Sequence, residues 1–595
     1  MAKDFSYHIR SFGGLAHYAQ RGERLQVHQS PDMQNFIITE DRRLKKRPGF
    51  RTLAQPGSKI RGLWTGLLQG QRHFLAVEGS RVRHSLNGFA DTQVIGYLPG
   101  QDRVQILEFH GQLMLLGGIS IRIFHPEEGL RDMVPYCPLV MVATTPQGVG
   151  TPYEDANLVG TKMRQRFSPD GVSTQYQLCL APIDGVDRVE LAGQVIPPEQ
   201  YTVDLQAGTL NFLQAPALEL ADSLEVTFTR EVVGWLGRIG HCRWGTVYGG
   251  DNDLCVFLWG NPDYPATRFH SGLVNGVPSC EYFPESNYTL VGDGSAITDI
   301  VRHYDRQLIF TREAAYYSYP QTGTDSLGRT RTAYPVYALS TAAGSVAPGT
   351  ACLVKNDPVT VSWGGLCRWQ STALREEKNA RVFSERIQGA LEHRDMTRLR
   401  LFSCKSQDTL WILTQEGDIF VYAARVDCFY KFTGLDCYSL WEDPVEQQIY
   451  FGTRDGRICQ IGGTSDDGRA IEAYWQSGEL DFSYPSYTKS LFRLGVEMTP
   501  CEDNALSVHW SCDVEGKNLP NSATKRFASQ QRLFGWEGLD WSNFSFNTAY
   551  SRRLLTRRME ARRFSALRLT LRSTDPRELE ISQLRFWGVC NDKII

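Results

Sequence analysis

A pair of apolar runs joined by a tight polar or glycine turn recurs along most of this chain. The clearest copies lie at 408–423 (DTLWILTQEGDIFVYA) and 447–461 (QQIYFGTRDGRICQI), with Gly417 and Gly456 in their turns. Glycine beside a polar residue supplies the positive φ that a hairpin reversal needs. The Val, Ile, Phe and Tyr residues on either side suit a half-buried pleated surface. The repeated unit therefore predicts β-hairpins and an all-β chain.

The spacing of the repeat points to one architecture in particular. Further copies begin at Gly70, Gly111, Asp253, Arg306 and Thr350. The first two copies, and again the last two, are about 40 residues apart, which is near the spacing of propeller blades. We therefore predict a β-propeller, whose radial construction leaves few strand edges open. The same pattern also allows ordinary hairpins in a large β-sandwich protein.

The length of 595 residues exceeds what one core can hold, so about two to four domains are expected. Short alternating strands separated by Asp184-Gly185 and Ala207-Gly208 indicate a small β-sandwich inserted into the propeller. After Gly462-Gly463 the composition shifts and short strands resume. The predicted domains are an N-terminal segment with the first blades (1–137), the insertion (138–232), the remaining blades (233–462) and a C-terminal β-sandwich (463–595).

Two segments allow a more local prediction. In 374–396 (LREEKNARVFSERIQGALEHRDM) the apolar residues Val382, Phe383, Ile387, Ala390 and Leu391 fall on one helical face. This predicts an amphipathic helix that packs over the propeller or its central hole; the alternative is a partner-binding helix. In 565–574 three leucines, at 567, 569 and 571, alternate with Arg568, Thr570 and Arg572, which predicts a strand buried on one side.

Two dense basic clusters are candidate contacts for DNA or a partner. On charge alone we favour a solvated edge for the first cluster, and a solvated face or a subunit contact for the second, over a contact with DNA phosphates. The first cluster comprises Arg42, Arg43, Lys45, Lys46 and Arg47, and the second Arg552, Arg553, Arg557, Arg558, Arg562 and Arg563.

Composition narrows the class of protein further. The net charge of −3 argues against a whole molecule that binds nucleic acid electrostatically. The 14 cysteines are scattered without any C-x-x-C pair, as expected of small buried residues in a reducing compartment, and zinc is not expected. The N-terminus lacks an apolar signal region and no run reaches 18 apolar residues, so neither a signal peptide nor a membrane span is expected.

No catalytic motif stands out in the sequence. A G-x-S-x-G elbow, a P-loop, an H-E-x-x-H pair and a Rossmann glycine signature are all missing. We therefore predict that the chain is not an enzyme and holds no cofactor or metal. A glycosidase stays open by analogy, because propellers host such enzymes and the two carboxylates they need meet only in space.

Three segments resemble tail hub and nozzle proteins of short-tailed bacteriophages, a group that includes the packaged-DNA stabilisation proteins. The first is Asn35-Phe36 followed by the run from Arg43 to Phe50. The second extends from Arg268-Phe269-His270-Ser271-Gly272 through 282–287 and 291–294 to Ile300, and the third is 380–387. The pattern at 184–212 also resembles an Ig-like insertion common in phage structural proteins.

This resemblance implies a structural virion protein of the tail, made in the host cytoplasm. Such a protein would form a homo-oligomeric ring, by resemblance a hexamer, beneath the portal or adaptor ring and beside tail fibre or spike proteins. It would enclose the DNA exit channel, touch genomic double-stranded DNA transiently and retain packaged DNA until ejection. The alternatives are a carbohydrate-binding or glycosidase-like propeller for host attachment, and a tail-tip or baseplate protein of a long-tailed phage.

Overall fold

The computed structural model describes residues 3–18, 25–249, 253–292, 294–324, 330–372, 375–499, 504–514, 521–529 and 553–593. It is nearly all β, as the sequence predicts. The chain divides into two compact units. Unit 1 comprises Met1–Gly66, Asn87–Asp91 and Ser345–Ile595, and unit 2 comprises Leu67–Leu86 and Thr92–Gly344. Strand β6 (Ile60–Leu68) leads from the first unit into the second, and η1 (Phe89–Asp91) belongs to the first.

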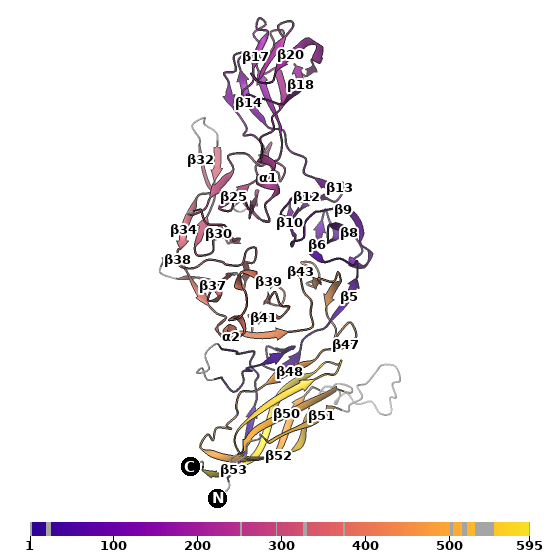
Figure 1. The fold of residues 1–595 in the computed structure, drawn as a ribbon, viewed down its shortest axis with the longest axis vertical. Coiled ribbons are helices and arrows are strands. Elements are labelled where there is room, and N and C mark those ends of the chain that lie inside the picture. Colours follow the sequence, from indigo (N-terminus) through magenta and orange to yellow (C-terminus); the bar gives the residue numbers. More distant parts are fainter. Residues whose placement is uncertain are drawn as a thin grey trace. The chain divides into compact units, whose positions relative to one another are not determined.

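Unit 2 contains a series of antiparallel sheets built from strands that are near neighbours in sequence (Figure 1). Within this unit β7 (Gln71–Glu78), β8 (Arg81–Ser85) and β9 (Gln93–Tyr97) pair in order. Three four-stranded sheets follow: β10 (Gln105–Phe109), β11 (Gln112–Leu116), β12 (Ile121–His125), β13 (Gly129–Asp132); β23 (Trp244–Tyr248), β24 (Cys255–Trp259), β25 (Thr267–His270), β28 (Tyr288–Leu290); β29 (Asp299–His303), β30 (Arg306–Phe310), β31 (Ala315–Ser318), β34 (Val336–Ser340). Two hairpins lie between these strands: β26 (Leu273–Val274) with β27 (Val277–Pro278), and β32 (Gln321–Thr324) with β33 (Thr330–Ala333).

The segment predicted as an insertion forms two sheets of its own within unit 2. One has the order β15-β14-β16-β22-β18-β19 and the other β17-β21-β20. The rings of Phe167 and Phe212 both meet Tyr176 edge-on in the core, at 5.4 and 5.5 Å between centroids. The elements are β14 (Leu139–Thr144), β15 (Thr151–Pro152), β16 (Lys162–Phe167), β17 (Gln175–Gln177), β18 (Gly185–Leu191), β19 (Gln194–Val195), η2 (Pro198–Gln200), β20 (Tyr201–Asp204), β21 (Thr209–Phe212) and β22 (Leu224–Thr229), followed by α1 (Trp235–Gly240).

Unit 1 continues the series of short antiparallel sheets. The predicted hairpins at 408–423 and 447–461 are confirmed, with Gly417 at φ 97° and Gly456 at φ 89° in their turns. The sheets comprise β35 (Cys352–Val354), β36 (Asp357–Ser362), β37 (Gly365–Thr372), β38 (Arg375–Val382); β39 (Arg400–Cys404), β40 (Thr409–Leu413), β41 (Ile419–Ala423), β42 (Cys428–Phe432); and β43 (Ser439–Glu442), β44 (Ile449–Gly452), β45 (Ile458–Ile461), β5 (Phe50–Ala54), β46 (Ser465–Asp466), β47 (Arg469–Ala470).

An N-terminal strand is built into the last of these sheets. β5 pairs antiparallel with β45, from Ile461 opposite Phe50 to Ile458 opposite Ala54. Strands about 400 residues apart in sequence therefore share one ladder, so this sheet needs both the segment at 50–54 and the segment at 439–470.

The largest sheet has ten strands and also joins the two ends of the chain (Figure 1). β1 runs antiparallel to β53, from Lys3 opposite Cys590 to Ile9 opposite Leu584. The sequence-based boundaries 1–137 and 463–595 therefore separate strands that belong to one sheet. Its strands are β1 (Lys3–Ile9), β2 (Met33–Gln34), β3 (Phe36–Ile38), β4 (Leu44–Lys46), β48 (Ala473–Gln476), β49 (Tyr487–Met498), β50 (Asn504–Val514), β51 (Asn521–Ser529), β52 (Arg553–Ser573) and β53 (Glu580–Lys593).

The long strand β52 changes its pairing partners along its length. From Arg553 to Phe564 it pairs with β49, and from Phe564 onward with β50 and then also with β48. The change falls beside Arg563, whose φ of 48° interrupts the extended backbone. The predicted one-sided strand is confirmed, since the three leucines at 567, 569 and 571 are buried while Arg568 and Arg572 are exposed.

The predicted helix at 374–396 is wrong. Residues Arg375–Val382 form strand β38, and helical turns appear only as η4 (Glu385–Ile387), α2 (Gln388–Leu391) and η5 (Met396–Arg398); 373 and 374 lie outside the described residues. Among the described strands, β38 is the edge strand of its sheet and pairs with β37 alone. Edge strands carry charged residues that discourage further pairing, so Glu, Lys and Arg are common there as well as in helices.

We expect Leu569→Ala to lower the free energy of unfolding of unit 1 by about 2–5 kcal/mol, because it leaves a cavity in a close-packed interior. Leu569 is fully buried, at 0% exposed. The matched control is Thr570→Ala on the opposite face of the same strand, with an expected change below about 0.5 kcal/mol. Denaturant unfolding followed by tryptophan fluorescence measures both. Equal effects of the two substitutions would contradict the assigned faces.

Candidate functional site

The N-terminal basic cluster contains a buried arginine. Arg47 is 2% exposed, and its guanidinium donates to Asn35 Oδ1 at 2.9 Å and to the carbonyl of Thr433 at 2.9 Å. It also forms a two-point ion pair with Asp466, at 3.0 and 2.7 Å, and donates to the carbonyl of Pro48 at 2.9 Å. The sequence offered no local signal for Asp466, which lies 419 positions away, just after Gly462-Gly463. The hydrogen bonds and the ion pair of Arg47 therefore link segments that are distant in sequence.

Lys46 is also internal, at 3% exposed. Its ammonium donates to the carbonyls of Asp575 and Arg577, the latter at 3.4 Å. Burial lowers the pKa of Lys46 to about 8, because the charged form loses water that two carbonyls replace only in part. The prediction that Lys46 and Arg47 contact DNA or a partner is wrong, since neither presents its charge at the surface.

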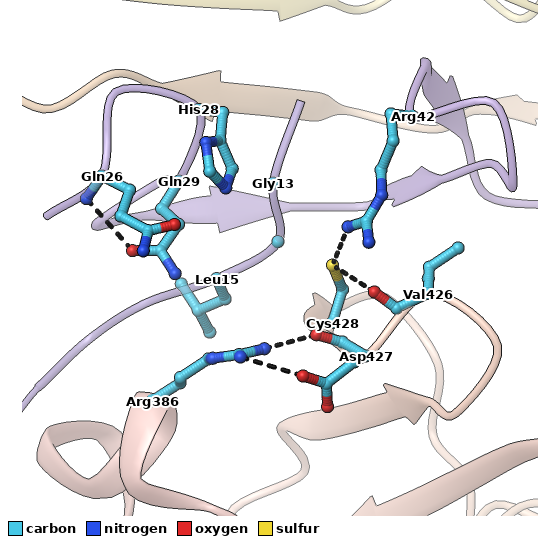
Figure 2. Close-up of a pocket in the computed structure, with 11 residues that line it drawn as sticks. Gly13, Leu15, Gln26, His28, Gln29, Arg42, Arg386, Val426, Asp427 and Cys428 are labelled. Atoms are coloured by element: carbon cyan, nitrogen blue, oxygen red, sulfur yellow. Dashed lines mark hydrogen bonds and ion pairs between the residues drawn. The ribbon is translucent and has the colours of Figure 1, made fainter. Parts of the chain in front are cut away.

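The other members of this cluster differ from one another. Arg43 pairs with Glu580 at 2.7 Å and with Asp41 at 2.8 Å, and Lys45 pairs with Glu578 at 2.5 Å. Their charges are thus met by carboxylates of the same unit. Arg42 is exposed and lines a cavity together with Arg386 (Figure 2). Among the exposed or half-buried members of the first cluster, Arg42 is the one whose described side-chain partner is not a carboxylate.

The C-terminal cluster lies along β52 and is largely solvent-facing. Arg557, Arg558, Arg562 and Arg563 are exposed, whereas Arg552 and the side chain of Arg553 lie outside the described residues. Arg558 forms an ion pair with Glu560 at 3.5 Å. In the ladder between β49 and β52, Arg558 lies opposite Arg493. Like charges directly opposite on a sheet are unfavourable, so this face suits an acidic partner better than bare solvent.

The second resemblance segment is part of the interior of unit 2. Arg268 is 0% exposed and donates to Ser318 Oγ at 2.8 Å, to the carbonyl of Tyr334 at 2.6 Å and to the Gln307 side chain. Its guanidinium lies 5.2 Å from the ring centroid of Phe257, and burial lowers the pKa of Arg268 to about 10. Arg268 joins β25 to β30 and β31 of another sheet, so this segment has a structural role in the unit.

A cavity of about 340 Å³ in unit 2 contains two adjacent carboxylates. Glu154 accepts from the Tyr136 hydroxyl at 3.0 Å and from the backbone N–H of Leu139 at 2.7 Å. Asp155 accepts from Arg331 at 3.0 Å. Both carboxylates are thus held by donors of the protein itself. His270 lines the same cavity, and burial lowers its pKa to about 3, so its ring is neutral. Nothing in this geometry assigns a reaction to the cavity.

The described residues also lack two features that would suggest other functions. They contain no group of three or more His, Cys, Asp or Glu side chains placed to hold a metal ion. Nor does any helix in the described ranges have the length and apolar character to cross a membrane.

Comparisons with known proteins give little guidance. No protein-family model matches the sequence, and a search of curated proteins finds no match. Among solved structures, a gluconolactonase from Xanthomonas campestris is similar at 8% identity and a TM-score of 0.28, over 76% of this chain and 99% of that chain. YCF48 from Cyanidioschyzon merolae is similar at 10% identity and a TM-score of 0.26, over 69% and 98%. Similarity at this level supports no conclusion about fold or function.

We expect Arg47→Met to destabilise unit 1 by about 3–5 kcal/mol, because Asp466 would keep a largely buried charge without its partner. The control is Lys45→Met, whose exposed pair with Glu578 is worth about 1 kcal/mol or less. Denaturant unfolding at neutral pH compares the two variants. A loss for Lys45→Met as large as that for Arg47→Met would contradict the assignment of Arg47 as the buried link between distant segments.

The depressed pKa of Lys46 predicts a pH-dependent stability. Below pH 8 the folded and unfolded chains both carry the charge, and the cost of burying it is fully present. Between about 8 and the ordinary value of 10.5 the unfolded chain binds more protons, so stability rises with pH. Each pH unit is worth about 1.4 kcal/mol.

The measurement is the free energy of unfolding of wild type minus that of Lys46→Met, between pH 7 and 10. We expect the difference to be flat up to about pH 8 and then to shift in favour of the wild type. A constant difference across the whole interval would show that Lys46 titrates alike in both states.

Proposed function

We propose that this chain is a ring-forming nozzle or hub subunit in the tail of a short-tailed bacteriophage. In this proposal the short antiparallel sheets form a β-propeller, and the separate two-sheet segment and the ten-stranded sheet provide contacts between subunits. The ring, with six copies as the expected number, encloses the DNA exit channel beneath a portal or adaptor ring and beside fibre or spike proteins. It retains packaged DNA until ejection and carries no enzymatic activity or cofactor.

The observation that carries the proposal is the pairing of β5 with β45. This pairing covers an edge that the last short sheet would otherwise expose, using a strand from the start of the chain. A succession of short sheets whose final member contains the N-terminal strand is what a circular arrangement of blades requires.

The distribution of charge also supports a conduit. A channel has to let DNA slide, and each phosphate neutralised by a lysine or arginine adds affinity that holds the DNA in place. In the first basic cluster, Arg43, Lys45 and Arg47 are each paired with a carboxylate of the same unit. The chain as a whole has a net charge of −3. Contacts with DNA would then be few and brief.

The full-length chain should assemble into rings with a central opening. Light scattering coupled to size-exclusion chromatography would give the subunit number, expected to be six, and negative-stain microscopy the opening. Labelling of this subunit in virions should place it at the tail. A chain that stays monomeric at all concentrations and is missing from tails would overturn the proposal, and glycan binding by that monomer would favour the host-attachment alternative.

A further inference from the structure

A small cavity in unit 1 brings together two arginines from distant parts of the sequence. It has a volume of about 220 Å³ and is lined by the segments 13–15 and 26–29, by Arg42 and Arg386, and by 426–428 (Figure 2). Arg42 belongs to the turn between β3 and β4, and Arg386 to η4. The sequence grouped Arg42 with its basic neighbours and gave no sign that it meets Arg386.

The walls of this cavity are held by main-chain hydrogen bonds. Phe12 N–H donates to the carbonyl of Arg42 at 2.9 Å, and Leu15 N–H to that of Phe429 at 2.7 Å. His17 N–H donates to the carbonyl of Arg386 at 2.6 Å. The segment from Phe12 to His17 thus fixes the backbones that carry both arginines, so the site is organised before any ligand arrives.

The charges inside the cavity do not balance. Arg386 pairs with Asp427 at 2.9 Å, and the same carboxylate accepts from the Tyr422 hydroxyl at 2.9 Å. The described partner of Arg42 is the sulfur of Cys428, 3.4 Å from Nη1. Burial raises the pKa of this thiol, so the sulfur is uncharged. Two guanidinium groups therefore face one carboxylate, which leaves one positive charge in excess.

The third basic side chain adds a hydrogen-bonding group without adding charge. Burial lowers the pKa of His28, and Arg42 and Arg386 lower it further. A neutral imidazole offers one donor and one acceptor. An anion beside Arg42 would find a guanidinium fork and a ring nitrogen within one recess.

We propose that this cavity binds one compact oxyanion, a phosphate ion or a carboxylate group, with Arg42 as its principal contact. A planar guanidinium with several parallel N–H donors matches the geometry of both anions, and partial enclosure strengthens the attraction. The DNA backbone is the less suitable source of a phosphate. The side chain of Asp427 is 63% exposed at the same site, and its charge would repel the phosphates that flank any one residue of a duplex. This inference does not depend on the proposed function.

The test measures the binding of inorganic phosphate to the full-length chain by calorimetry, at constant ionic strength set with sodium chloride. We expect saturable binding at one site per chain, displaced by acetate. Arg42→Gln should weaken it by about tenfold or more, the value of one hydrogen bond to a charged group. Because Arg42 is an exposed turn residue, this variant should keep the wild-type melting temperature.

The matched control is Arg425→Gln, which removes an exposed arginine that pairs with Asp408 at 2.8 Å and Glu40 at 3.2 Å and does not line the cavity. Phosphate binding should be unchanged in this variant. Failure to bind phosphate, or an equal loss in both variants, would overturn the proposal. So would a short duplex DNA that competes with phosphate and loses its own binding in Arg42→Gln, because the site would then belong to nucleic acid.

Discussion

The hydrogen bonds of Arg47 hold four separate stretches of unit 1 at one point. Its guanidinium meets Asn35, the carbonyl of Thr433 and the carboxylate of Asp466. Asn35 in turn donates to the carbonyl of Glu472 at 2.7 Å and accepts from Thr433 N–H at 2.9 Å. A buried charge is tolerated only when its donors are satisfied, so each partner has to be present for the others to be stable. This requirement fixes where the N-terminal segment runs.

The position of Arg47 determines how strands near the two ends of the chain pair. Immediately after Arg47 the chain enters β5 and its ladder with β45, and immediately before it lie β3 and β4, which belong to the ten-stranded sheet. One guanidinium thus stands between two sheets that both contain N-terminal and C-terminal strands. Contacts over such sequence separations require long loops to close before they contribute stability, which makes this part of the fold slow to form.

Features set by neighbouring residues could be predicted from the sequence, and features set by distant partners could not. The hairpins at Gly417 and Gly456 followed from turn chemistry, and the buried leucines of β52 followed from alternation. Lys46 and Arg47 looked like a solvated basic run because the carbonyls of Asp575 and Thr433 and the carboxylate of Asp466, which hold their charges, lie more than 380 positions away.

The segment at 375–382 was misassigned for a different reason. Its charged and alanine residues favour a helix when taken alone, yet the single ladder with β37 decides its conformation. Similarly, the cavity at Arg42 could not be seen in the sequence, because Arg386 and Asp427 come from separate turns of the chain.

Some basic side chains of unit 1 are neutralised inside it and others are exposed, and this difference determines which partners its surface can bind. The charge of Arg47 is neutralised by Asp466 inside the unit. The charges of Arg42 and of the face of β49 and β52 that carries Arg493 and Arg558 are exposed to solvent. These exposed charges lie at two places, Arg42 and the exposed arginines along β52, in a chain whose net charge is negative. A surface of this kind recognises individual acidic groups at defined places rather than a continuous polyanion, because attraction that depends on many charges needs them in an array. The proposed passage of DNA without capture and the proposed binding of a single oxyanion therefore place compatible demands on the charges of this chain.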